Sequence, residues 1–311
     1  MPLWAAVLFA VSAAAAPQKG WDWRETTTPH FHILHQAPWL PQGLTIGVER
    51  IHSRLRMDLG VFSPWMAKER ISLYVYQDSQ AYLEGEFSPP AWSNGIAVFG
   101  QKAVAIPTMK DPAQMMRTIA HETTHLLFVD FFQEKKLTPP SWLNEGLAMV
   151  EEAATRDKPE TSVWYQHMVG MSAGSWIPLE SFFKISPKDL GNNQASVEAW
   201  YVQAYSITLF LVKKHSNLQF KSFCSQLRDG KTPTQALWLV YRCRRISDFE
   251  SQWKAWLADP AHQRRVAALA SGQKDAGDQP EGKAASPVPA FGHFSNGRGF
   301  KSGFSSSSDG R

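Results

Sequence analysis

Two histidines four positions apart lie inside a long stretch that has the features of an α-helix. Asp111-Pro112 supplies an N-cap and a proline at the first helical position, and residues 112–132 contain no glycine and no further proline. Because helical positions four apart share one face, His121 and His125 project in the same direction. Any fold of this chain therefore has to place two imidazoles on one side of a long helix.

The motif His121-Glu122-Thr123-Thr124-His125 is typical of a zinc site. Two imidazoles one turn apart can bind one ion, while Glu122 is rotated by about 100° and can act as general base toward a metal-activated water. A site that keeps one position open for water needs a third protein ligand. Glu145, on the next expected helix, is the candidate, and we expect one Zn²⁺ per chain.

Hydrophobic periodicity predicts strands in the first part of the chain and helices in the second. After a turn at 26–29, strands are expected at 31–35, 71–76, 95–99 and 103–106, the last two as a hairpin around 100–102, with a helix at 43–59. Beyond the 112–132 helix, further helices are expected at 141–154, 195–214, 220–227, 233–241 and 247–257. This order favours an α+β protein with two lobes.

His121-Glu122-x-x-His125, followed by Trp142-x-x-Glu145-Gly146-x-Ala148, resembles the gluzincin metallopeptidases, the thermolysin-like branch of the zincins. The similarity is greatest to the compact bacterial peptidase MA-like metallohydrolases and covers about residues 31–211. It implies a zincin-like α+β fold, in which a twisted mixed sheet packs on the active-site helix and a C-terminal helical lobe follows. In such proteins the edge strand before that helix, here within 95–106, often holds an extended peptide.

By this resemblance His121, His125 and Glu145 are the zinc ligands and Glu122 is the catalytic base. The family also carries a tyrosine near the metal on a long helix, which corresponds to Tyr201 in the segment 199–205. One phenol there can hydrogen-bond the developing oxyanion. Tyr205 lies four positions later on the same helix face and is the alternative.

Thermolysin has an acidic residue four positions after its glutamate ligand, which orients a ligand histidine. Here that position holds Met149, so the partner of the histidines is not identified from the sequence. Glu151 and Glu152 follow nearby, but on different faces of the helix from one another.

The ends of the chain differ in composition from its middle. Residues 1–16 carry no charge, and an apolar run followed by small residues predicts a signal peptide and hence an exported protein, whether periplasmic, cell-surface or secreted. Residues 17–270 are expected to form the metallopeptidase domain, with the sheet lobe ending at about 135. Residues 271–311 are rich in Gly and Ser and are expected to be a disordered tail.

Charge and cysteine usage exclude several classes of partner and site. The 32 Lys and Arg against 28 Asp and Glu leave a net charge of +4, which is too small to favour nucleic acid as a partner. No segment after the signal is long and apolar enough to span a membrane. Two cysteines cannot build a metal cluster; Cys224 and Cys243 either pair in an oxidising compartment or remain two buried thiols.

The sequence thus predicts an exported zinc metallopeptidase that acts on a peptide or protein substrate; the oligomeric state stays open. Two alternatives remain: a catalytically inactive, zinc-stabilised surface or binding protein, and a metal-dependent hydrolase of cell-wall amides. His30, His32 and His35 form a second histidine cluster. No cysteine or carboxylate nearby in the sequence completes a metal set with them, so we interpret them as the polar end of a strand.

Overall fold

The computed structural model describes residues 22–91, 93–191 and 193–272. The predicted signal peptide lies outside these residues, as does the predicted tail apart from residues 271 and 272, which end the last helix. The strands are β1 (Arg24–Thr27), β2 (Phe31–His35), β3 (Ile71–Tyr76), β4 (Ile96–Val98) and β5 (Ala103–Pro107). The helices are α1 (Leu44–Leu59), α2 (Ser79–Leu83), α3 (Pro112–Gln133), α4 (Ser141–Ala153), α5 (Val163–Gly170), α6 (Leu179–Phe182), α7 (Gln194–Lys214), α8 (Asn217–Arg228), α9 (Pro233–Tyr241), α10 (Ile246–Leu257) and α11 (Pro260–Gly272).

The five strands form one mixed sheet in the order β1-β2-β3-β5-β4. The three inner strands run parallel, while β1 and β4 pair antiparallel at the two edges. The expected hairpin is present as β4 and β5, with Lys102 in the left-handed region at φ 47° in its turn. A mixed sheet followed by helices confirms the predicted α+β, zincin-like class.

Alternating side chains of the inner strands enter two separate hydrophobic clusters, as the period of a strand requires. Ile33, Leu73 and Val104 face the cluster shared with α1 and α3. Leu34 and Tyr74 face the other cluster, which includes residues of α2. The sheet is thereby covered on both sides. Helix α3 packs against β5 and β4, at one edge of the sheet.

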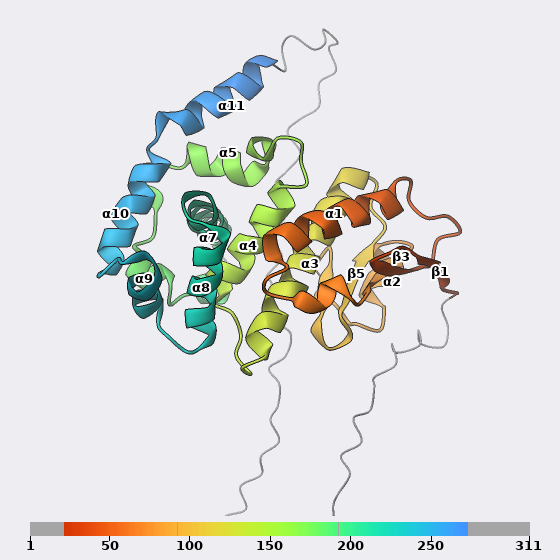
Figure 1. The fold of residues 1–311 in the computed structure, drawn as a ribbon. Helices are drawn as coiled ribbons and strands as arrows, with labels where there is room; N and C mark the ends of the chain where they lie inside the picture. Colours follow the sequence, from red (N-terminus) through yellow and green to blue (C-terminus); the bar gives the residue numbers. More distant parts are fainter. Residues whose placement is uncertain (1–21, 92, 192, 273–311) are drawn as a thin grey trace, which may run out of the picture.

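Helix α4 lies between α3 and α7 and joins the sheet lobe to the helical lobe (Figure 1). Gly146 lets α4 approach α7 closely, because a Cβ at that position would meet the Thr208 side chain and the carbonyl oxygen of Ala204 on α7. The helices α8, α9 and α10 continue the helical lobe on the side away from the sheet.

The predicted helices agree with the structure, apart from small shifts at their ends. Asp111 caps α3 by accepting a hydrogen bond from the Ala113 N–H at 2.9 Å, as expected. Helix α8 begins three residues before the predicted start at 220, because Ser216 and Gln219 form a capping box there. Helices α2, α5, α6 and α11 were not predicted.

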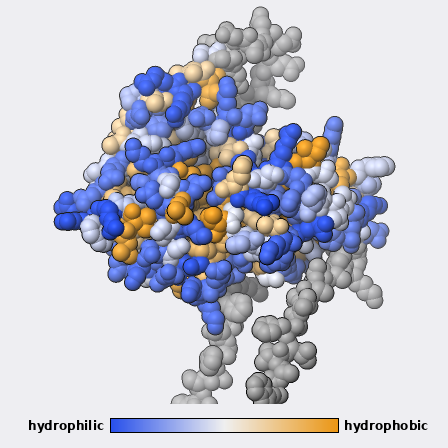
Figure 2. Space-filling view, in the orientation of Figure 1, coloured by the Kyte–Doolittle hydropathy of each residue, from blue (hydrophilic) through white to orange (hydrophobic). Residues whose placement is uncertain are grey.

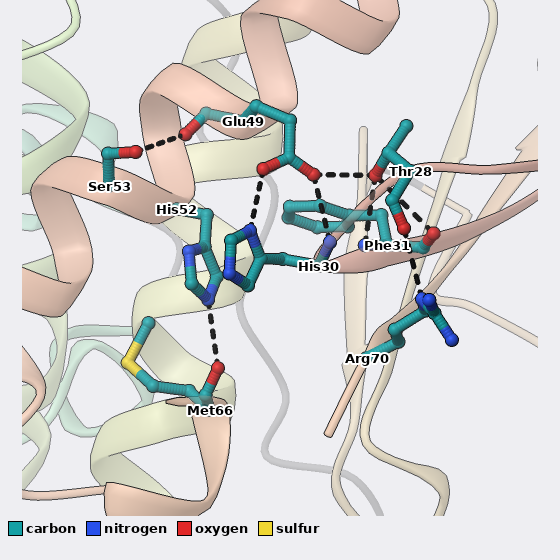
Figure 3. Close-up of polar contacts among 8 residues, drawn as sticks. All are labelled: Thr28, His30, Phe31, Glu49, His52, Ser53, Met66 and Arg70. Carbon is teal, nitrogen blue, oxygen red and sulfur yellow. Dashed lines mark hydrogen bonds and ion pairs between the residues drawn. The ribbon is translucent and has the colours of Figure 1, made fainter. Parts of the chain in front are cut away.

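The turn predicted at 26–29 was placed too early, because Thr26 and Thr27 belong to β1. The chain turns after them, and Glu49 of α1 holds the turn (Figure 3). Glu49 accepts hydrogen bonds from Thr28 Oγ1 at 2.6 Å and from the His30 N–H at 3.0 Å, and its second oxygen lies 2.7 Å from His30 Nδ1.

The second histidine cluster has separate structural contacts. The ring of His30 stacks on that of His52 at 3.8 Å, His32 lies 3.2 Å from a Glu25 oxygen, and His35 Nδ1 lies 2.9 Å from the Ala37 carbonyl oxygen. Among the described residues, none of the three belongs to a group that could hold a metal ion. The contacts of His30 and His32 with carboxylates fit the polar strand end predicted from the sequence, whereas His35 is buried.

The two cysteines are free and buried. Cys224 lies on α8, and Cys243 follows α9. Of the two alternatives left open by the sequence, the structure has the pair of buried thiols.

Candidate metal centre

The two motif histidines of α3 and the glutamate of α4 meet at one point. Nε2 of His121 and Nε2 of His125 lie 3.9 and 3.7 Å from the same atom, Oε2 of Glu145. All three side chains are buried, and one ligand atom from each lies within 4.8 Å of the others. Tetrahedral zinc bonds of about 2.0 Å place ligand atoms roughly 3.3 Å apart. The two distances to Glu145 are slightly wider than this, so the ligand atoms would draw together around a bound ion.

The charges around the three residues also fit a cation. Burial disfavours the imidazolium of His121, yet the hydrogen bond that its Nδ1–H donates to Glu152 and the charges of Glu122, Glu152 and Glu145 outweigh this effect and raise the pKa of His121 to about 9. Burial raises the pKa of Glu145 to about 7, with the charge of Glu122 adding to the effect and that of His121 opposing it. A buried pocket of this kind favours positive charge, and a divalent ion supplies it.

His125 is kept neutral, which is the form that binds metals. Burial and the charge of His121 lower the pKa of His125 to about 3, against a smaller opposing effect of the Asn144 side chain. Asn144 directly precedes Glu145 on α4, so the same turn of helix that carries the expected third ligand also contacts the second histidine.

The partner of His121 that the sequence left unidentified is Glu152. Its Oε2 lies 3.2 Å from His121 Nδ1, the nitrogen that does not face Glu145. Glu145 and Glu152 are seven positions apart, which is close to two helical turns, so both carboxylates share one face of α4. Glu151 points elsewhere, and its Oε2 lies 3.5 Å from Arg54 Nε on α1. The seven-residue spacing was present in the sequence and could have identified Glu152.

Glu122 faces the edge strand β4. A Cβ on Gly95, just before β4, would lie 2.9 Å from Glu122 Cγ, so only glycine fits there without a shift of the neighbouring side chains. Burial raises the pKa of Glu122 to about 6, opposed by the charge of His121 and by the backbone N–H of Ala97. Glu122 is thus a buried carboxylate beside both the histidines and the edge strand. Neither Gly95 nor Ala97 was singled out from the sequence.

The two tyrosines of α7 have different surroundings. Tyr201 is buried, and burial together with the nearby charge of Glu145 raises its phenol pKa. Its ring lies 5.1 Å from that of Trp200. Tyr205 is also buried, but its hydroxyl hydrogen-bonds to Ser162 before α5. The structure therefore places Tyr201 closer to the candidate ligands, and its catalytic role stays a prediction.

The sequence profile of the Peptidase MA superfamily matches residues 53–259, which is more than half of the chain and includes the motif on α3 and the glutamate on α4. No curated protein matches the chain. The match agrees with the resemblance to gluzincin-like metallopeptidases and with the buried His121, His125 and Glu145. The chain belongs to the Peptidase MA superfamily.

Proposed function

We propose that this protein is an exported, zinc-dependent metallopeptidase of the gluzincin type, with Glu122 as the general base. The observation that carries the proposal is the convergence of His121, His125 and Glu145 beside Glu122 in a buried site. Membership of the Peptidase MA superfamily supports a peptidase and a peptide substrate.

The donor set favours zinc in a catalytic arrangement. Two imidazoles and one carboxylate are a common catalytic zinc set, whereas structural zinc sites usually close all four positions with Cys or His. Neither cysteine belongs to the group that could hold the ion. When bound, zinc supplies Lewis acidity, which lowers the pKa of water and polarises a carbonyl group.

The remaining steps are assigned to groups of this protein. Glu122, whose raised pKa of about 6 suits a base that works near neutral pH, takes the proton of the attacking water and passes it to the leaving amine. The phenol of Tyr201 donates a hydrogen bond to the developing oxyanion. The main chain of β4 binds the peptide in an extended form, antiparallel or parallel to the strand.

Export rests on the composition of residues 1–16. Among the described residues, no helix has the length and apolar character needed to cross a membrane. The intact Glu122 argues against the inactive binding protein, because a purely structural zinc site has no use for a base. The cell-wall amide hydrolase shares the same chemistry and differs only in substrate.

The proposal is tested first by metal analysis of the purified mature chain and of a His121→Ala, His125→Ala double variant. We expect about one zinc per wild-type chain and none in the variant. Glu122→Gln should keep the zinc and lose about 10²–10⁴-fold in turnover of a peptide library. Full turnover by Glu122→Gln would disprove the mechanism, and cleavage of wall fragments in place of peptides would favour the amide hydrolase.

A further inference from the structure

Helix α9 exposes an aromatic and an aliphatic side chain and is followed by a group of arginines. Trp238 and Leu239 are 39% and 43% exposed. The guanidinium carbons of Arg242 and Arg244 lie 5.7 and 5.5 Å from the centre of the Trp238 ring. Because a cation is attracted to the face of an indole ring, one exposed tryptophan holds two arginines on the same part of the surface.

The end of α9 packs on the turn between α7 and α8. The ring of Tyr241, the last residue of α9, lies 4.2 Å from the ring of His215 in that turn. Lys214 is exposed beside His215, and Leu218 at the start of α8 is 75% exposed. We define the α9 patch by four exposed residues on α9 and directly after it: Trp238, Leu239, Arg242 and Arg244.

The α9 patch carries more positive than negative charge. Asp248, the nearest acidic residue in the sequence, is bound by Arg245 at 2.8 Å and also interacts with the charge of Arg244. Arg242, Arg244 and Arg245 thus stand against one carboxylate. Figure 1 places α8 and α9 in the helical lobe, away from the sheet, and Figure 2 shows hydrophobic residues among hydrophilic ones on this lobe.

We propose that the α9 patch is a docking surface for an anionic lipid membrane. Tryptophan favours the level of the lipid headgroups, exposed leucines gain by entering the acyl boundary, and arginine and lysine are attracted to anionic headgroups. The mixture of these three features distinguishes the patch from a nucleic-acid surface, on which the aliphatic Leu239 would gain nothing.

Membrane docking at this place is peripheral and independent of the proposed peptidase reaction. The α9 patch includes none of the candidate metal ligands and neither Glu122 nor Tyr201. Only a few side chains and two arginines take part, so the binding is reversible and becomes weaker as the salt concentration rises.

The test is sedimentation of the full mature chain with phosphatidylcholine vesicles that either contain or lack phosphatidylglycerol. We expect binding only to the anionic vesicles. The Arg242→Gln, Arg244→Gln variant should bind on the order of 30-fold more weakly, at roughly fivefold for each charge removed, while Arg242→Lys, Arg244→Lys should bind like wild type. Unchanged thermal melting of each variant shows that the fold is intact.

The matched control is Arg50→Gln, Arg56→Gln, which removes two exposed arginines from α1 in the other lobe. It should leave vesicle binding unchanged. Three outcomes would overturn the proposal. The wild-type chain would bind both vesicle types equally, the α1 variant would lose binding in place of the α9 variant, or the chain would bind a single-stranded oligonucleotide but not vesicles. Hydrolysis of a short soluble peptide should be the same in all variants, so failure of the peptidase assignment is seen separately.

Discussion

The carboxylate of Glu152 lies 3.2 Å from Nδ1 of His121, while the Glu145 carboxylate faces Nε2 of the same ring at 3.9 Å. One helix thus holds the imidazole between two carboxylates. A carboxylate on the outer nitrogen fixes the tautomer and the orientation of the ring and raises its basicity as a ligand. Glu152 therefore takes the place of the acidic residue that Met149 replaces in the sequence pattern.

Replacing Glu152 by Gln should lower zinc affinity about tenfold, the lower end of the usual range for such partners, because the amide oxygen still accepts a hydrogen bond. Competition with a zinc chelator measures this. Glu151→Gln is the matched control: its carboxylate pairs with Arg54, so zinc affinity should stay the same while the melting temperature falls. Equal zinc affinity in the two variants would contradict the role given to Glu152.

Tyr201→Phe should reduce kcat by about 10²-fold with little change in KM, because an oxyanion donor acts mainly in the transition state. Steady-state kinetics on a peptide substrate separate the two constants. Tyr205→Phe removes a hydroxyl that hydrogen-bonds to Ser162 and should leave kcat within about twofold of wild type. If both variants lose the same activity, Tyr201 has only a packing role.

Gly146→Ala should destabilise the protein by roughly 1–3 kcal/mol, although alanine is the better helix former. The added Cβ would meet Thr208 and the Ala204 carbonyl oxygen, so α4 and α7 would have to move apart. Thermal unfolding provides the measurement. Gly170→Ala, where a Cβ meets nothing within 4 Å, should not lower the melting temperature. A stable Gly146→Ala variant would show that the contact is not tight.

The free energy of unfolding should decrease at acidic pH because His52 becomes protonated. Burial and the charges of His30 and Arg56 lower the pKa of His52, against the opposing Met66 carbonyl and Glu49. The unfolded chain therefore binds a proton at His52 more readily than the folded chain does. The contribution of neutral His52 to the free energy of unfolding is complete above about pH 6.5 and is lost as the pH falls through the pKa of the folded state.

Chemical denaturation at several pH values, with a chelator present throughout, measures this dependence. His52→Gln should show a smaller loss of unfolding free energy than wild type between neutral pH and about pH 5. An identical loss in both proteins would assign the acid sensitivity to other groups.

The sequence by itself determined the elements whose signals are local. A cap at Asp111 and a stretch without glycine or further proline fix α3, and the spacing of four then places His121 and His125 on one face. Alternating apolar residues similarly fix the inner strands. Two of the elements that were missed depend on contacts with the rest of the fold. β1, with mostly exposed side chains, is defined by its pairing with β2, and α11 is held by His262, whose Nδ1 lies 2.7 Å from the Tyr165 hydroxyl.

The tertiary structure decided which residues complete the candidate site. Periodicity separates Glu151 from Glu152 on α4, but only the tertiary packing shows that Glu152 faces His121 on α3 and Glu151 faces Arg54 on α1. The tertiary packing also brings Gly95 against Glu122. Sequence spacing fixes directions within one helix, whereas contacts between helices depend on how their side chains pack, which is set by the whole core.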